Sequence, residues 1–273
     1  MKRFNSQLTS GRGFGLLVIL VGLFVVITLA QEKKPVSELS GDLSKELPRV
    51  PSRTPQESRE VIQIQAGFRV ELVAHEPLVH DPVAIDFDAF GRMYVIQLPG
   101  YNAYGKKGAK QGGSIVLLAD SDQDGRYEKS TLYADNFKYP TALACWDGGL
   151  FVADSPDLLY VKDLDGDGKV DQRQIVFSGF GADKAGEAYL NSIRWGLDHQ
   201  FHLCTSFSGG QVVRVGDQAA VPLEVRNRGF QFDPRTLEMT ATTGAGQHGL
   251  AFNDWGQMFT CRNSNPFRLV MYE

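Results

Sequence analysis

Carboxylates recur in two short acidic loops, and their spacing is that of a calcium site. The loops run Asp120-Ser-Asp122-Gln-Asp124-Gly125-Arg-Tyr-Glu128 and Asp163-Leu-Asp165-Gly-Asp167-Gly168-Lys-Val-Asp171. Each places carboxylates at positions 1, 3, 5 and 9 and a glycine at position 6, as loops of the EF-hand type do. Alternate side chains of such a loop converge on one hard cation, so the sequence predicts two Ca²⁺ sites.

A polar hairpin turn is the simpler alternative for both loops. Apolar runs flank them, which indicates β-hairpins, and Asp-Gly is a strong turn signal that needs no metal. Position 12, where an EF-hand loop carries a bidentate Glu, holds Thr131 in one loop and Gln174 in the other. A turn nevertheless needs one acid, and several carboxylates in one loop repel each other unless a cation or solvent compensates. We therefore expect weak, structural calcium binding.

A second set of candidate residues stands at the ends of predicted strands. His248 follows the glycine-rich Gly244-Ala-Gly-Gln and opens an apolar stretch, so it could act as a general base toward a bound ligand. The alternative is a histidine that is satisfied by a backbone carbonyl. The residues at comparable positions, each with packing or a turn as its alternative role, are Asn191, Arg194, Arg262 and Asn263.

The elements that position these residues are strands. From residue 61 the chain consists of short β-branched and aromatic runs separated by Gly, Asp and Pro, and no segment holds a helical period. A strand, an Asp-centred turn and a second strand recur from residues 82, 140, 191 and 248. This repeat predicts an all-β fold, a β-propeller of four-stranded blades, rather than a sandwich of two sheets.

The number of repeats and the ends of the chain give the domain plan. About four blades fit in residues 61–273, whereas propellers close with about four to eight, so we expect a truncated part of a larger propeller. Residues 31–60 are rich in Pro, Ser, Glu and Lys and are expected to be a flexible linker. Residues 1–30 join a basic start to an apolar run, which predicts a cleaved export signal or, alternatively, an uncleaved membrane anchor. Either places the propeller in the periplasm.

Charge and cysteine content exclude some classes of function. The net charge of -4 and the lack of a basic stripe argue against nucleic acid as a partner. No CxxCH is present, so this chain carries no c-type haem attachment of its own. The three cysteines, Cys145, Cys204 and Cys261, stand in apolar stretches, where burial is the simpler explanation, and one disulfide remains open without an assigned pair.

The chain also resembles a known family. The resemblance rests on the run from Gly67 to Val73, the twin acidic hairpins, and the runs 191–196, 248–256 and 263–265. Together they resemble the N-terminal propeller of membrane-bound dehydrogenases from planctomycetes and related bacteria. That propeller is similar to the soluble glucose/sorbosone dehydrogenases, six-bladed proteins that use pyrroloquinoline quinone and calcium.

The resemblance implies a quinone-dependent sugar or alcohol dehydrogenase, with a cytochrome c as the electron acceptor. His248 would take the hydroxyl proton as hydride leaves for the quinone, Arg194 or Arg262 would balance charge on the quinone, and Asn191 and Asn263 would contact it. This chain departs from the family at Pro266, where relatives carry a histidine. The alternatives are a non-catalytic propeller that binds carbohydrate or protein with structural calcium, and a calcium-dependent lactonase.

Overall fold

The computed structural model describes residues 50–99, 101, 112–183 and 186–271. The chain divides into two units, Met1–Ser52 and Arg53–Glu273, and the second unit holds all of the described helices and strands. The predicted export segment, residues 1–30, lies outside the described residues. In the part of the chain that the structure describes, no helix is long and apolar enough to cross a membrane.

One short helix, α1 (Pro55–Glu60), precedes the strands. Thr54 caps it, because the Thr54 side chain accepts a hydrogen bond from the backbone N–H of Glu57 and the Glu57 carboxylate accepts one from the backbone N–H of Thr54. Pro55 at the first helical position needs no donor there. The end of the segment that we expected to be a linker is therefore helical, since a capping box is a local signal that composition alone does not report.

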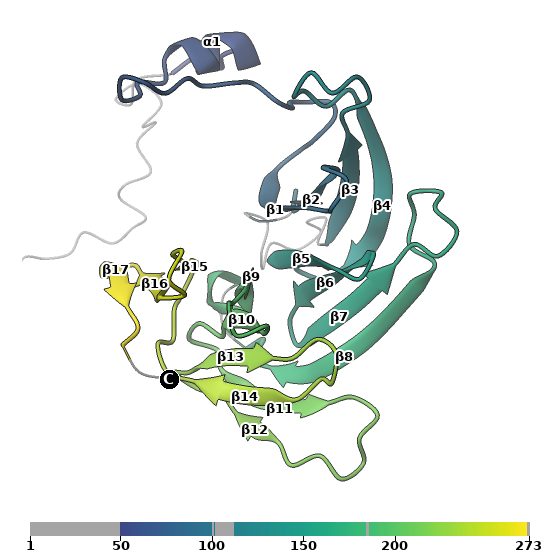
Figure 1. The fold of residues 1–273 in the computed structure, drawn as a ribbon, viewed down its shortest axis with the longest axis vertical. Helices are drawn as coiled ribbons and strands as arrows, with labels where there is room; N and C mark the ends of the chain where they lie inside the picture. The colour runs from purple at the N-terminus through teal and green to yellow at the C-terminus, as the bar shows by residue number, and fades with distance from the viewer. Residues whose placement is uncertain (1–49, 100, 102–111, 184–185, 272–273) are drawn as a thin grey trace, which may run out of the picture. The chain divides into compact units, whose positions relative to one another are not determined.

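Strands make up almost all of the remaining regular structure, in four successive antiparallel groups (Figure 1). The first blade is β1 (Pro82–Phe87), β2 (Met93–Gln97), β3 (Gly113–Ala119) and β4 (Lys129–Phe137). The second blade is β5 (Ala142–Trp146), β6 (Gly149–Asp154), β7 (Asp157–Lys162) and β8 (Gln172–Phe180). The third blade is β9 (Asn191–Trp195), β10 (Phe201–Cys204), β13 (Gly229–Phe232) and β14 (Met239–Thr242). The fourth blade is β15 (Leu250–Phe252), β16 (Met258–Arg262) and β17 (Asn265–Leu269).

The order of contacts between blades is that of a propeller. The first strand of each blade contacts the first strand of the next, β1 with β5, β5 with β9, and β9 with β15. In a propeller these are the inner strands around the central channel. They begin at residues 82, 142, 191 and 250, within two residues of the predicted repeat. The all-β propeller prediction is confirmed, with four blades in the described residues.

One hairpin departs from the simple repeat. The strands β11 (Gly210–Arg214) and β12 (Leu223–Glu224) are inserted between β10 and β13 of the third blade. They add to the edge of the second blade instead, where β11 pairs with β8, so that sheet has six strands in the order β12-β11-β8-β7-β6-β5. The insertion therefore covers an edge that would otherwise be open to pairing with another chain.

The hydrophobic core lies between the blades. One cluster joins the second blade to the third through buried aromatic rings, among them Phe151, Phe177 and Phe230. A second cluster joins the first blade to the second and includes Tyr94 and Tyr133, whose rings meet edge to face at 5.0 Å. Burial of apolar area between sheets is the main favourable term in folding, so these clusters fix where each inner strand begins and ends.

Candidate functional site

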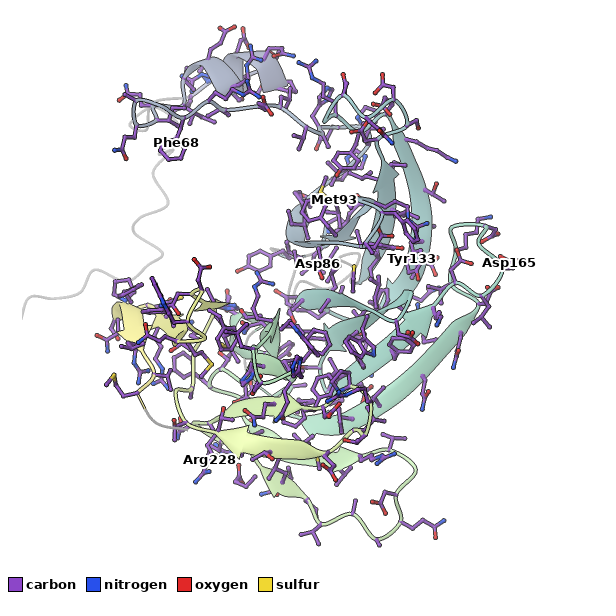
Figure 2. The ribbon with its side chains drawn as sticks, in the orientation of Figure 1. Phe68, Asp86, Met93, Tyr133, Asp165 and Arg228 are labelled. Carbon is purple, nitrogen blue, oxygen red and sulfur yellow. The ribbon has the colours of Figure 1, made fainter. Side chains whose placement is uncertain are left out.

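Both acidic loops form the tips of hairpins, as the flanking strands predict. The loop at 120–128 joins β3 to β4, and the loop at 163–171 joins β7 to β8; Figure 2 shows Asp165 at the tip of the second hairpin. In the first loop, oxygens of Asp120, Asp122, Asp124 and Glu128 all lie within 4.8 Å of one another. In the second loop the corresponding group is Asp163, Asp165 and Asp171. Asp167, which the spacing also predicts as a ligand, is not in that group.

The same four backbone hydrogen bonds shape the two loops. In the second, the N–H of Gly168 donates to Asp163 at 2.8 Å and the N–H of Leu164 donates to Asp171 at 2.7 Å. The N–H of Asp167 donates to Asp165 at 3.1 Å and the N–H of Lys169 donates to Asp167 at 2.8 Å. Each bond has its equivalent in the first loop. These bonds occupy one oxygen of each carboxylate and leave the other available to a ligand, except in Asp163, whose Oδ1 also accepts a hydrogen bond from the N–H of Gly166 at 2.7 Å.

The charge state of the loops suits a hard cation. Burial acts to raise the pKa of Asp163, but the backbone N–H groups of Gly168 and Gly166 outweigh it, so the pKa lies below its usual value and the carboxylate is ionised at neutral pH. In the first loop, Oδ1 of Asp120 is buried and has no hydrogen-bond partner among the described residues. Oxygen ligands that are ionised and partly unpaired are those that Ca²⁺ and Mg²⁺ prefer.

Position 8 of each loop anchors it to the segment that precedes its own blade. The N–H of Tyr127 donates to the carbonyl of Val73 at 2.9 Å, and Tyr127 and Ala74 both pack against a buried cluster of the first blade. The N–H of Val170 donates to the carbonyl of Tyr133 at 2.9 Å, and Val170 packs against the cluster between the first and second blades. A cation in either loop would therefore stiffen contacts between neighbouring parts of the propeller.

The second candidate group gathers where β9 and β15 begin. Asn191 is 2% exposed, and its amide nitrogen donates to the carbonyls of Tyr189 at 2.8 Å and Gln247 at 2.7 Å. Its amide oxygen accepts a hydrogen bond from the Ser192 hydroxyl at 2.6 Å. Both donors of the amide are occupied by the protein itself. Asn191 is thus placed to hold the segment before His248, and its amide has no donor left for a cofactor.

Three further predicted residues surround that segment. His248 is exposed, and its carbonyl accepts a hydrogen bond from the Cys261 thiol. Arg262 donates from Nε to the carbonyl of Ala245 at 3.0 Å, and the N–H of Asn263 donates to Oε1 of Gln247 at 3.3 Å. Arg262, Asn263 and Asn191 therefore all bind the segment 245–248, which carries His248; we call these four residues the channel-end group.

Arg194 lies apart from the channel-end group. It is three residues further along β9 than Asn191, about 10 Å at roughly 3.3 Å per residue. There it is the pairing partner of His202, whereas Asn191 pairs with Cys204. Arg194 is exposed, and its Nη1 donates to the carbonyl of Ile193 at 2.9 Å. Among the described residues, the side chain of Arg194 has a hydrogen bond to its own strand and none to the channel-end group.

His202 is a buried histidine that no sequence motif indicated. It is 5% exposed, and its Nε2 lies 2.9 Å from a carboxylate oxygen of Asp198 in the turn between β9 and β10. The first blade has the same arrangement four residues apart, Arg92 on Asp88 at 2.7 Å. The Asp-centred turn of each repeat was the available signal. Because the pair recurs, its primary role is to lock a turn, although His202 also lines a cavity of about 310 Å³ between the third and fourth blades.

A protein-family model matches most of the chain. The model of a domain of unknown function, DUF7133, matches residues 54–273. None of the curated proteins matches the chain in sequence.

Solved structures give weaker likenesses. The PQQ domain of pyranose dehydrogenase from Coprinopsis cinerea is 12% identical with a TM-score of 0.49, over 76% of this chain and 51% of that domain. The periplasmic gluconolactonase PpgL of Pseudomonas aeruginosa is 14% identical with a TM-score of 0.38, over 70% of this chain and 72% of that protein. The chain thus spans about half of the pyranose dehydrogenase domain. These identities and scores are too low to transfer a reaction, a substrate or a cofactor.

Proposed function

Because the chain belongs to the DUF7133 family, whose own description names no activity, we propose a function from its sites: a binding propeller of an exported or membrane-tethered protein, with structural calcium in its two acidic hairpins. The observation that carries the proposal is the repeated set of carboxylates, which meet within 4.8 Å in both hairpins. The ligand of such a module is a carbohydrate or another exported protein, bound at the inner strands.

Calorimetric titration of the purified chain with Ca²⁺ tests the metal part. We expect two binding events, one of which is lost in Asp122→Asn and the other in Asp165→Asn. The matched control is Asp135→Asn, because Asp135 is an exposed acid of β4 outside both loops. Absence of binding at millimolar Ca²⁺, or equal binding by all three variants, would show that the loops are polar turns without a metal site.

The second candidate is oxidation of a sugar or an alcohol with a bound quinone. It is favoured by one observation: three residues before the exposed His248, the carbonyl of Ala245 accepts hydrogen bonds from both Arg262 and Arg268, at 3.0 and 3.3 Å. Two guanidinium groups on one carbonyl fit a group that bears carboxylates, as pyrroloquinoline quinone does. When bound, the quinone supplies the two-electron acceptor.

The residues of this chain have separate roles in that candidate. His248 accepts the proton of the substrate hydroxyl, Arg262 and Asn263 orient the negatively charged edge of the ligand, and Asn191 holds the segment that carries His248. Dye-linked oxidation assays with quinone and Ca²⁺ over a sugar panel test it, with His248→Ala as the variant and His199→Ala as its matched control. His199 is exposed in the turn after β9, away from this group. Equal rates for both variants would exclude His248 as the base.

Carbohydrate binding separates the two candidates. The binding module predicts retention of the chain on polysaccharide that survives His248→Ala and is lost when Ca²⁺ is chelated. The oxidation candidate predicts turnover that His248→Ala abolishes while binding remains.

A further inference from the structure

Two of the three cysteines come from neighbouring blades and meet at one dipeptide. Cys204 ends β10 in the third blade, and its Sγ donates to the carbonyl of Gly249 at 3.8 Å. Cys261 lies in β16 of the fourth blade, and its thiol donates to the carbonyl of His248, directly before Gly249. The N–H of Cys261 also donates to the carbonyl of Gly249, at 3.3 Å. Both thiols therefore contact the short segment between the two blades.

Glycines make room for both sulfurs. A Cβ added to Gly246 would lie 2.6 Å from Sγ of Cys204, and a Cβ added to Gly249 would lie 2.7 Å from Sγ of Cys261. Any other residue at these positions would have to push a sulfur away. Thiols are weak hydrogen-bond donors, so little free energy holds each sulfur on its present acceptor. Both sulfurs therefore lie beside the segment 246–249, and each is held on a backbone carbonyl only by a weak thiol hydrogen bond.

We propose that Cys204 and Cys261 are a redox-active pair that forms a disulfide across the third and fourth blades when the chain meets a low-molecular-weight disulfide oxidant. The third cysteine, Cys145, stays reduced. It lies in β5, where its N–H donates to Asp86 of the first blade at 2.8 Å. This inference does not rest on the proposed function.

The order of the chemical steps follows from exposure. Cys261 is half-buried, whereas Cys204 is 1% exposed, and burial, with a contribution from the nearby Cys261, raises the pKa of Cys204 to about 12. The thiolate of Cys261 therefore attacks oxidised glutathione first, which forms a mixed disulfide and releases one glutathione thiolate. The Cys204 sulfur then attacks Sγ of Cys261, and its proton goes to the departing glutathione thiolate, which leaves as the second molecule of glutathione. Two thiols of the protein are oxidised, and one glutathione disulfide is reduced.

Thiol counting and peptide mapping of the whole chain test the pair. The purified chain is equilibrated with oxidised glutathione, alkylated in denaturant and digested without reduction. We expect one alkylated cysteine per chain, Cys145, a peptide cross-linked between residues 204 and 261, and a melting temperature several degrees above that of the reduced chain. Three alkylated cysteines, or a cross-link that includes Cys145, would overturn the proposal.

Single serine variants supply the control. Cys145→Ser should keep the cross-link and the rise in melting temperature, because Cys145 takes no part in the pair. Cys204→Ser and Cys261→Ser should each lose both effects, and Cys261→Ser should also leave Cys204 free of bound glutathione, because Cys204 is buried. A rise in melting temperature that persists in Cys261→Ser would contradict the pairing. The wild-type peptide map remains decisive if a variant fails to fold.

Discussion

Asp165 and Asp167 offer a matched pair for the calcium hypothesis. They carry the same charge in the same hairpin, yet only Asp165 belongs to the group of carboxylates that meet within 4.8 Å. Each uses Oδ1 to accept a hydrogen bond from a backbone N–H, at 3.1 Å for Asp165 and 2.8 Å for Asp167. An asparagine keeps that Oδ1 acceptor, so the change Asp→Asn removes the charge and leaves the bond that shapes the loop.

The expected effect can be worked from linkage. For the affinities of extracellular calcium modules, about 10⁻⁴ to 10⁻³ M, roughly 10 mM Ca²⁺ stabilises the folded chain by about 1.4–2.7 kcal/mol per site. At about 2–4 °C per kcal/mol for a domain of this size, one site raises the melting temperature by about 3–11 °C. A tenfold loss of affinity in Asp165→Asn would remove about 1 kcal/mol of that stabilisation, or about 2–5 °C. Asp167→Asn loses only a screened surface interaction, below about 0.5 kcal/mol.

Thermal melting in chelator and in Ca²⁺ measures both variants. The quantity compared is the Ca²⁺-dependent rise in melting temperature, so any effect of a substitution on the metal-free chain is subtracted. Equal losses of that rise in the two variants would refute the geometric assignment of ligands. Absence of any rise in the wild type would refute the calcium sites altogether.

Three further predictions concern buried side chains of the propeller. Asn191→Ala should lower the free energy of unfolding by about 2–4 kcal/mol, because two buried carbonyls lose their hydrogen-bond donor. The control Asn263→Ala changes an exposed turn and should lower it by less than about 0.5 kcal/mol. Equal losses for the two variants in chemical denaturation would contradict this. Burial raises the pKa of Asp154 despite two backbone donors, so its contribution to stability is present at low pH and is lost as pH rises through the folded-state pKa. The melting temperature of the wild type minus that of Asp154→Asn should therefore increase as pH falls from about 7 to about 4. A constant difference would show that Asp154 does not titrate in this way. Phe230→Ala, which empties a fully buried position between the second and third blades, should cost about 3–5 kcal/mol in the same denaturation assay.

The propeller could be predicted from the sequence because its signals are local. Strands and Asp-centred turns recur along the chain, and inner strands begin at Pro82 and Asn191 as the repeat indicates. The hairpin of β11 and β12 could not be predicted in the same way, since β12 has only two residues, and β11 pairs with β8 of another blade. Pairing that depends on a neighbouring sheet leaves no period in the sequence that forms it.

In the candidate sites too, features set by local spacing could be predicted, and contacts between distant residues could not. The hairpin loops follow from spacing within nine residues, and the structure keeps seven of the eight predicted acids together. Asp167 departs although it accepts the same backbone hydrogen bond as Asp124 in the first loop, so nothing in the spacing distinguishes the two residues. The occupied amide of Asn191 depends on Gln247, 56 residues away, and no local pattern reports such a contact.

The separation of the two sites decides how calcium dependence should be interpreted. The acidic hairpins join β3 to β4 and β7 to β8, whereas the channel-end group lies where the inner strands β9 and β15 begin. A chelator that abolished binding or turnover would therefore not place calcium beside the ligand, because loss of the hairpin cations alone could loosen the blades through the anchors at Tyr127 and Val170. Hairpin variants assayed well below their melting temperature distinguish the two cases. If these variants keep full function while the chelator still removes it, a cation must act at the ligand itself.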